Sequence, residues 1–177
     1  MTPSPIRFEV LIERYHDEIY RYVWRLLQTT SPIDRALEVQ DLTQETFIRA
    51  YRAFGRLRHD SNHRAWLYKI ATHCAYTALK RGQRQARYQT TASAEAQQAP
   101  ETAQASPDQQ MIQGETLQEI CAAISALPPK QKMAVILRHV QGLEYAEIAE
   151  ALDCSPASAR ANVYQGLRRM RQVLQKD

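Results

Sequence analysis

Residues 127–174 decide the fold of this chain, and they read LPPKQKMAVILRHVQGLEYAEIAEALDCSPASARANVYQGLRRMRQVL. Pro128 and Pro129 suit a first helical turn, where a missing amide donor costs nothing. Gly142 suits the position just past a helix end. Between the prolines and the glycine, apolar residues recur at helical spacing, so this part predicts one helix.

Two short helices joined by a tight turn are predicted after Gly142. Residues 145–152 carry apolar side chains on one face, residues 153–155 are few enough for a tight turn, and Ser155 before a proline suits an N-cap. Residues 156–174 combine an apolar stripe with polar side chains elsewhere. This pattern indicates a helix-turn-helix, which places its second helix in the major groove of DNA. Three helices of an ordinary all-α core are the alternative.

Positive charge is concentrated in one block of the sequence. The whole chain has 23 Lys and Arg against 19 Asp and Glu, a formal net charge of +4. Residues 49–87 hold ten of these bases and one acid, whereas residues 88–115 hold four acids and no base. A dense basic block favours a polyanionic partner such as nucleic acid over a merely solvated helix face, which normally mixes both signs.

Helical periodicity continues through the rest of the chain, so we expect an all-α fold. Apolar spacing predicts N-terminal helices over residues 7–28, 41–54 and 65–81. A helix break is predicted after each of them, in the order Ser31-Pro32, Gly55 and Gly82. A further helix is expected to start near Gln113.

A polar stretch separates two parts of this pattern. Residues 88–110 have no apolar side chain larger than alanine after Tyr88, so they cannot bury enough surface to offset the entropy of ordering. We therefore expect two small helical domains, 1–87 and 113–177, joined by an acidic flexible linker at 88–112.

Other classes of site have little support. The three cysteines, Cys74, Cys121 and Cys154, match no zinc spacing and fit buried thiols in a reducing cytoplasm. No residue set resembles a nucleophile–base pair, a metal site or a phosphate-binding glycine loop, so we predict no enzyme, no cofactor and no metal. No apolar run nears the ~20 residues of a membrane helix, and no signal peptide is visible. We expect a cytoplasmic protein without membrane insertion and without a further C-terminal sensing domain.

Three segments together resemble a known family. DLTQETFIRAYRAF (41–54), WLYKIATHCAYTALKR (66–81) and the terminal stretch (127–174) resemble bacterial RNA polymerase sigma factors of the sigma-70 family, in order and in spacing. The resemblance is to the compact extracytoplasmic-function group, group IV, which keeps only regions 2 and 4 and a linker. It covers nearly the whole chain. It implies a subunit that binds core RNA polymerase and directs promoter recognition and transcription initiation, in the family for stress- or signal-responsive genes.

The resemblance implies contacts with polymerase. In the family, the helix matching 41–54 docks on the clamp helices of the β′ subunit, and the β flap is a further partner. The linker of relatives runs through the main channel of polymerase, although a plain spacer would serve as well here. The implied docking residues would otherwise be an ordinary solvated face, and they are Asp41, Gln44, Glu45 and Arg49.

The resemblance also implies contacts with the −10 element. A base that leaves the stack costs a few kcal/mol, and stacking on aromatic side chains recovers ~1–3 kcal/mol per base. The basic block offers charge interleaved with aromatic residues, Tyr68 and Tyr76 among them. His73 and Thr77 differ from the asparagine or aspartate that relatives often carry, so the −10 preference does not carry over. The implied set is Arg58, Asp60, Ser61, Asn62, Arg64, Trp66, Lys69, His73, Thr77, Lys80 and Arg81.

The −35 element would be read by the terminal helix-turn-helix. Gln165 stands where relatives usually have arginine, and Gly166 lies mid-helix, where glycine costs about 1 kcal/mol relative to alanine. The recognition helix is therefore less basic than average, and we expect weak binding to DNA by the isolated chain. The implied set is Arg138, Ser158, Arg160, Ala161, Asn162, Tyr164 and Gln165.

Two other functions remain open from the sequence. A stand-alone dimeric regulator would bind palindromic DNA tightly without polymerase. A protein-interaction adaptor with a degenerate helix-turn-helix would fit the departures at Gln165 and Gly166. Family members are often silenced by an anti-sigma factor, which the resemblance makes a further expected partner.

Overall fold

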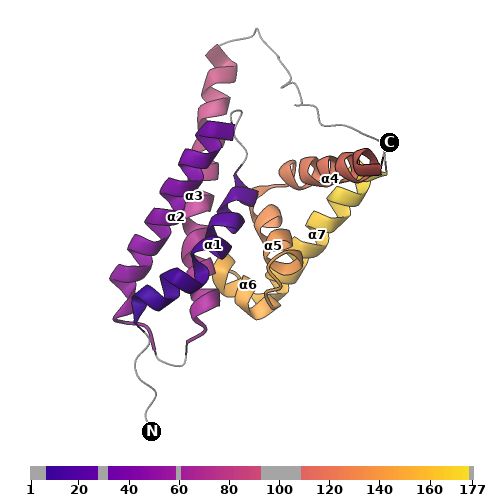
Figure 1. Ribbon diagram of the computed structural model, residues 1–177. Helices are drawn as coiled ribbons and strands as arrows, with labels where there is room; N and C mark the ends of the chain where they lie inside the picture. Colours follow the sequence, from indigo (N-terminus) through magenta and orange to yellow (C-terminus); the bar gives the residue numbers. More distant parts are fainter. Residues whose placement is uncertain (1–6, 28–31, 59–60, 93–108, 176–177) are drawn as a thin grey trace.

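The structure is a computed structural model that describes residues 7–27, 32–58, 61–92 and 109–175. These residues form seven α-helices, and no strand occurs among them. Figure 1 shows α1, α2 and α3 standing together on one side, with α4 to α7 on the other. The all-α prediction is confirmed.

The N-terminal domain contains α1 (Phe8–Leu26), α2 (Pro32–Phe54) and α3 (His63–Ala92), which pack against one another. Apolar side chains at three- and four-residue steps give each helix one buried face. At the centre, the ring of Tyr22 meets that of Tyr68 edge-on, with centroids 5.0 Å apart. The buried hydroxyl of Tyr22 lies 2.8 Å from that of Thr72 on α3. Burial of Tyr22 therefore leaves its polar group satisfied.

Two expected helix ends in this domain are wrong. The second helix begins at Pro32 and not at Asp41, because a proline can occupy the first turn of a helix as well as break one. Val39, in the added part, is fully buried. The third helix runs past Gly82 to Ala92, because an exposed glycine inside a run of helix formers weakens a helix by only about 1 kcal/mol.

The C-terminal domain contains α4 (Gln109–Ser125), α5 (Pro129–His139), α6 (Tyr145–Leu152) and α7 (Pro156–Leu174). The predicted helix-turn-helix is present as α6 and α7. Asp153 ends α6 in the left-handed region (φ 53°), which aspartate tolerates better than most residues. Ser155 then caps α7, because its side-chain hydroxyl accepts a hydrogen bond from the backbone amide of Ser158 at 3.1 Å. The helix before them, α4, begins at Gln109, four residues earlier than expected.

The two domains pack against each other in this structure. Helix α6 lies against α3, and α5 contacts both α1 and α3 (Figure 1). Buried residues of both domains form one continuous apolar cluster, which includes Tyr68 of α3 and Met133 of α5. The linker centre, residues 93–108, lies outside the described residues.

The described residues contain neither a membrane-spanning helix nor a cluster of metal ligands. None of their helices combines the length and the apolar character that crossing a bilayer requires. Their His, Cys, Asp and Glu side chains form no group of three or more that could hold a metal ion.

Lys132 gives the stability of the protein a predictable pH dependence. It lies buried on α5, and burial, followed by the charge of Arg35, lowers its pKa. Between that lowered value and about 10.4 the unfolded chain binds more protons, so stability should rise with pH in this window. Burial raises the pKa of Tyr22 and Tyr68, so stability should fall again above about pH 10.

Lys132→Met should remove the alkaline rise and stabilise the protein near neutral pH by about 0.5–2 kcal/mol. Urea unfolding at several pH values from neutral to 10 would measure both effects. Lys130→Met is the matched control, because Lys130 is exposed on the same helix. Equal pH slopes in the wild type and in Lys132→Met would contradict the assignment.

Candidate polymerase and DNA interfaces

The predicted polymerase residues lie along one side of α2. Asp41, Gln44 and Arg49 are exposed and Glu45 is half-buried. Glu45 accepts a hydrogen bond from Arg49 Nε at 2.6 Å, one helical turn away. An exposed pair of this kind contributes little to stability. These side chains are therefore available to a partner at low cost to the fold.

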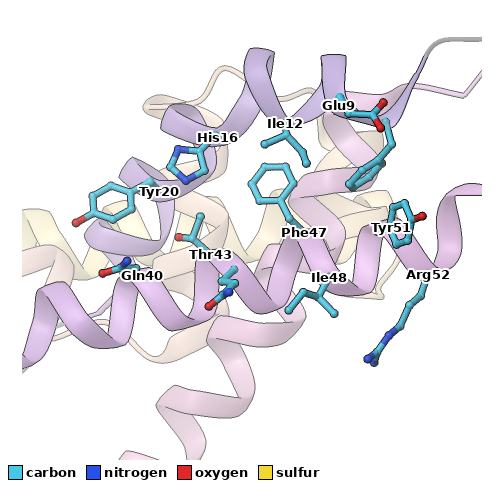
Figure 2. Close-up of a pocket in the computed structure, with 12 residues that line it drawn as sticks. Glu9, Ile12, His16, Tyr20, Gln40, Thr43, Phe47, Ile48, Tyr51 and Arg52 are labelled. Atoms are coloured by element: carbon cyan, nitrogen blue, oxygen red, sulfur yellow. The ribbon is translucent and has the colours of Figure 1, made fainter.

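Beside this face, α1 and α2 form an apolar groove of about 870 Å³, shown in Figure 2. On the α2 side, Gln40, Gln44, Ile48 and Tyr51 follow one another at steps of three and four residues, so they share a helix face. Ile48 and Tyr51 remain 38% and 68% exposed. Single exposed apolar residues are common, but here two of them line one groove.

The α1 wall of the groove is aromatic. His16 stacks on Phe47 with ring centroids 6.0 Å apart, and Phe8 meets Tyr51 edge-on at 5.3 Å. Sequence reasoning identified Gln44 but missed the rest of the groove. The available signal was Ile48 and Tyr51, two large apolar residues of the 41–54 helix that lie outside the apolar stripe of that helix, which is Leu42, Phe47, Ala50 and Phe54.

Two members of the predicted −10 set, Asn62 and Arg64, lie where the domains meet. Asn62 Oδ1 accepts a hydrogen bond from the backbone amide of Ala65, at the start of α3. The side-chain amide of Asn62 donates a hydrogen bond to Glu147 Oε1 at 2.5 Å. Arg64 donates to Glu18 Oε1 at 2.7 Å and to the carbonyl of Gln141 at 2.6 Å. Asn62 and Arg64, which the sequence assigned to DNA contacts, therefore make hydrogen bonds to α1, to α6 and to the turn between α5 and α6.

Further along α3, the predicted set is more open. Lys69 Nζ lies 3.8 Å from Asp153 Oδ1, in the other domain. His73, Thr77, Lys80 and Arg81 are exposed, and the hydroxyl of Thr77 donates to the carbonyl of His73 at 2.9 Å. These four side chains form an accessible polar and basic edge.

Three more described members of the −10 set, Arg58, Ser61 and Trp66, lie in the loop before α3 or in its first turn. Arg58 is exposed and Ser61 half-buried, whereas Asp60 lies outside the described residues. Trp66 is half-buried, with its ring 6.5 Å from that of Phe54, which agrees with a mainly structural role.

One expected aromatic contact with bases is wrong. Tyr68 is fully buried, and its hydroxyl donates to Glu18 Oε1 and Gln141 Oε1, both at 2.8 Å. Tyr76 is half-buried beneath Lys80, whose ammonium lies 4.8 Å from the ring centroid. In this arrangement Tyr68 holds the domains together and has no face free for a base.

The predicted −35 residues gather on the outer side of α7 and around Tyr145. The guanidinium groups of Arg138 and Arg160 lie 4.8 and 5.0 Å from the Tyr145 ring centroid. Arg138 also donates to the carbonyl of Leu143 at 2.8 Å. Tyr145 was missed from the sequence, although it sits at the start of the predicted helix. It places both arginines at one end of the helix-turn-helix.

The rest of this set is largely exposed. Tyr164 is 67% exposed, and Gln165 accepts a hydrogen bond from Gln131 Nε2 at 3.1 Å. Asn162 donates to the carbonyl of Ser158 at 2.9 Å. Short polar side chains of this kind on an outward helix face suit reading base edges. Exposed members of the set are Ser158, Arg160, Ala161, Tyr164 and Gln165, with Asn162 half-buried.

Family models match both domains. The model for sigma-70 region 2 covers residues 11–85, and the model for sigma-70, region 4 covers residues 117–170. Among curated proteins, the RNA polymerase sigma-H factor of Pseudomonas aeruginosa is 31% identical over 173 residues, which cover 95% of this chain and 86% of that protein. The ECF RNA polymerase sigma-E factor of Escherichia coli K12 is 30% identical over 162 residues, covering 89% and 81%.

Solved structures share the fold. The sigma factor RpoE from Bartonella quintana, determined with the anti-sigma factor NepR, superposes with a TM-score of 0.68 at 20% identity, over 96% of this chain and 98% of that one. CnrH, determined with the cytosolic domain of CnrY, gives 0.66 at 15% identity, over 96% and 88%. With two region models in order and relatives matched over most of their length, the chain belongs to the sigma-70 family of RNA polymerase sigma factors, in its extracytoplasmic-function group.

Proposed function

We propose that this sigma factor distributes its tasks over three helices. The outer face of α2 and the groove beside it dock on the β′ clamp helices of core RNA polymerase. The loop before α3 and the edge of α3 hold the opened −10 strand, and α7 reads the −35 duplex. The observation that carries this proposal is that accessible surfaces of different chemistry lie on three separate helices. Two of these helices, α2 and α3, belong to region 2, and α7 belongs to region 4.

Binding of a large polymerase would also suit the chemistry of each surface. The α2 surface is partly apolar, with Ile48 and Tyr51 exposed, as protein-binding sites are. The α3 edge and the α7 face are polar and basic, as surfaces that contact phosphates and base edges are. The protein would act in the cytoplasm, where polymerase is, and without catalytic chemistry.

An anti-sigma factor is a further proposed partner. Two of the similar structures, RpoE and CnrH, were determined with NepR, an anti-sigma factor, and with the cytosolic domain of CnrY. Regulation of this kind would connect the chain to a stress- or signal-responsive set of genes. Co-purification from uninduced cells would test it, and constitutive activity with no bound protein would argue against it.

The proposed function is tested by mixing the purified chain with core bacterial RNA polymerase and a fragmented genomic library, then sequencing the transcripts. Starts clustered downstream of one shared pair of motifs would support a sigma factor and give its promoter. Tight binding to a palindromic site without polymerase would instead favour a stand-alone dimeric regulator.

Arg160→Ala should reduce transcription from the promoters found in this way by about 5- to 150-fold, because a good arginine–guanine pair discriminates by ~1–3 kcal/mol. Arg160 is exposed at the start of α7, so its removal should leave the fold intact. Arg21→Ala removes the same charge from an exposed position on α1 and serves as control. Equal activity of the two variants would argue against base reading by Arg160.

A further inference from the structure

Gln165, a member of the −35 set, is held by a side chain of another helix. Gln131 of α5 donates a hydrogen bond from its Nε2 to Gln165 Oε1 at 3.1 Å. Gln131 is only 7% exposed, whereas Gln165 is exposed on α7. A buried amide therefore holds an amide at the protein surface, and only the outer one is within reach of a partner.

The packing of α5 against α7 brings the two side chains together (Figure 1). Pro128 and Pro129 start α5, so Gln131 lies in its first turn. Gly166, next to Gln165, has no side chain and lets α7 approach this turn closely. A Cβ atom at Gly166 would lie 3.4 Å from the carbonyl oxygen of Gln131 and 3.6 Å from its Cβ. This close approach fixes the point from which Gln131 reaches Gln165.

Burial of Gln131 determines which way the two amides are turned. Its Oε1 is buried and has no hydrogen-bond partner among the described residues. If both amides were reversed, Gln131 would accept the hydrogen bond, and its NH2 group, with two hydrogens, would be the buried group without a partner. Among backbone groups, buried donors without a partner are rarer than buried acceptors without one, and amide side chains share this chemistry. The arrangement in which Gln131 donates and Gln165 accepts is therefore the favourable one.

This arrangement changes what Gln165 offers to a base. A glutamine reads adenine with both ends of its amide, because the NH2 group donates to N7 and the oxygen accepts from the N6 amino group. Here Oε1 of Gln165 is turned towards Gln131, so the NH2 group is left to face outward. Guanine presents two acceptors, N7 and O6, on its major-groove edge. An outward donor group therefore matches guanine and keeps only half of its match to adenine.

We propose that Gln131 is a positioning residue for promoter recognition, which turns Gln165 into a donor and sets a preference for guanine at the −35 base pair that Gln165 meets. This inference rests on the proposed function, because it refines how α7 reads the −35 duplex. Gln131 is buried and acts only through Gln165. A glutamine without this restraint would prefer adenine at the same place.

The central variant is Gln131→Met, which removes the donor and keeps an unbranched side chain. Methionine suits a buried position and leaves no amide oxygen there without a partner, so the fold should remain. Gln165 is exposed and would then bond to water, with both ends of its amide available to a base. Gln165→Ala identifies the base pair concerned, since the preference at that pair should be lost. Gln118→Met is the matched control, because Gln118 is exposed on α4 and lies outside the −35 set.

Two measurements use one DNA library. The −35 region of a promoter found with core RNA polymerase is randomised, and each sequence is linked to a barcode in the transcribed region. In the first measurement, each variant initiates transcription with core polymerase, and the barcodes are counted in the RNA. In the second, the chain alone selects duplexes from the same library at low salt, and the bound DNA is sequenced.

We expect the wild type and Gln118→Met to prefer guanine to adenine by about 5-fold or more at the pair that Gln165→Ala identifies, which is the lower end for one good side-chain–base contact. Gln131→Met should lose this preference or reverse it towards adenine, with the other base pairs unchanged. A wild-type preference for adenine at that pair, or the same preference in the wild type and in Gln131→Met, would overturn the inference. A change spread over all −35 positions would indicate a displaced α7 and would overturn it as well.

The two measurements separate this inference from the proposed function. Initiation from defined promoters, with no base preference altered by Gln165→Ala, would overturn the inference and leave the proposed function standing. No initiation with polymerase, together with a preference on free duplex that changes in Gln131→Met, would overturn the proposed function and leave the role of Gln131 supported. Absence of sequence preference in both measurements would overturn both.

Discussion

Gly166→Ala is expected to destabilise the C-terminal domain by about 1–3 kcal/mol, as overpacking does, although alanine is the better helix former. A Cβ atom at Gly166 would lie 2.6 Å from Val135 Cγ2 and 3.4 Å from the carbonyl oxygen of Gln131. Val135 is buried and β-branched, so its side chain has little freedom to move aside within α5. The close approach of α5 and α7 therefore requires glycine at this position.

A second substitution should relieve the clash. Val135→Ala removes the atom that the new methyl group would strike, so Gly166→Ala should cost less in that background. A double-mutant cycle, followed by chemical denaturation, should give a favourable coupling of about 1 kcal/mol or more. Additive effects of the two substitutions would show that the contact with Val135 is not the cause.

Gly82→Ala is the matched control. Gly82 is exposed within α3, and a Cβ atom there would meet nothing within 4 Å. The same substitution should therefore stabilise the protein by about 0.5–1 kcal/mol, since only helix propensity is at work. Stabilisation by Gly166→Ala as well would contradict the packing argument.

Gly166 also shows where sequence reasoning was limited. Its position in the recognition helix looked like a weakness and left a degenerate adaptor open as an alternative. Its reason lies in Val135, a residue 31 positions away on another helix. A sequence pattern gives the propensity of a residue directly, whereas the distance between two packed helices appears only in the folded chain.

Local signals succeeded where their chemistry was unambiguous. Ser155 before Pro156 predicted the start of α7, and Asp153 could end α6 because aspartate tolerates the left-handed region. Pro32 and Gly82, in contrast, are ambiguous signals for where a helix begins or ends. Proline both breaks a helix and begins one, and glycine ends some helices but is tolerated in the exposed part of others.

Contacts between the domains could not be read from the sequence. Asn62 pairs with Glu147, and Arg64 pairs with the carbonyl of Gln141, yet nothing in the spacing of these polar residues shows that they meet. Tyr68 looked like a possible base platform because it lies in a basic segment. Its burial follows from the packing of α3 against α1 and against the α5–α6 turn, which no local rule describes.

Tyr51→Ala is expected to weaken binding of the chain to core RNA polymerase by roughly 30-fold, or about 2 kcal/mol. Tyr51 is 68% exposed at the edge of the groove between α1 and α2, where it meets Phe8 edge-on at 5.3 Å. A large aromatic side chain beside an apolar groove is typical of residues that dominate protein–protein affinity. The promoter contacts proposed for α7 should be unaffected.

Leu37→Ala is the matched control for this prediction. Leu37 is 57% exposed on the same helix but does not line the groove. Phe8 keeps its edge contact with Phe54 at 5.3 Å in the absence of Tyr51, so circular dichroism should show both variants folded. Polymerase affinity would be measured by surface plasmon resonance with immobilised core enzyme. Equal losses in the two variants would indicate a general effect of α2 hydrophobicity, and the groove would then have no special part in docking.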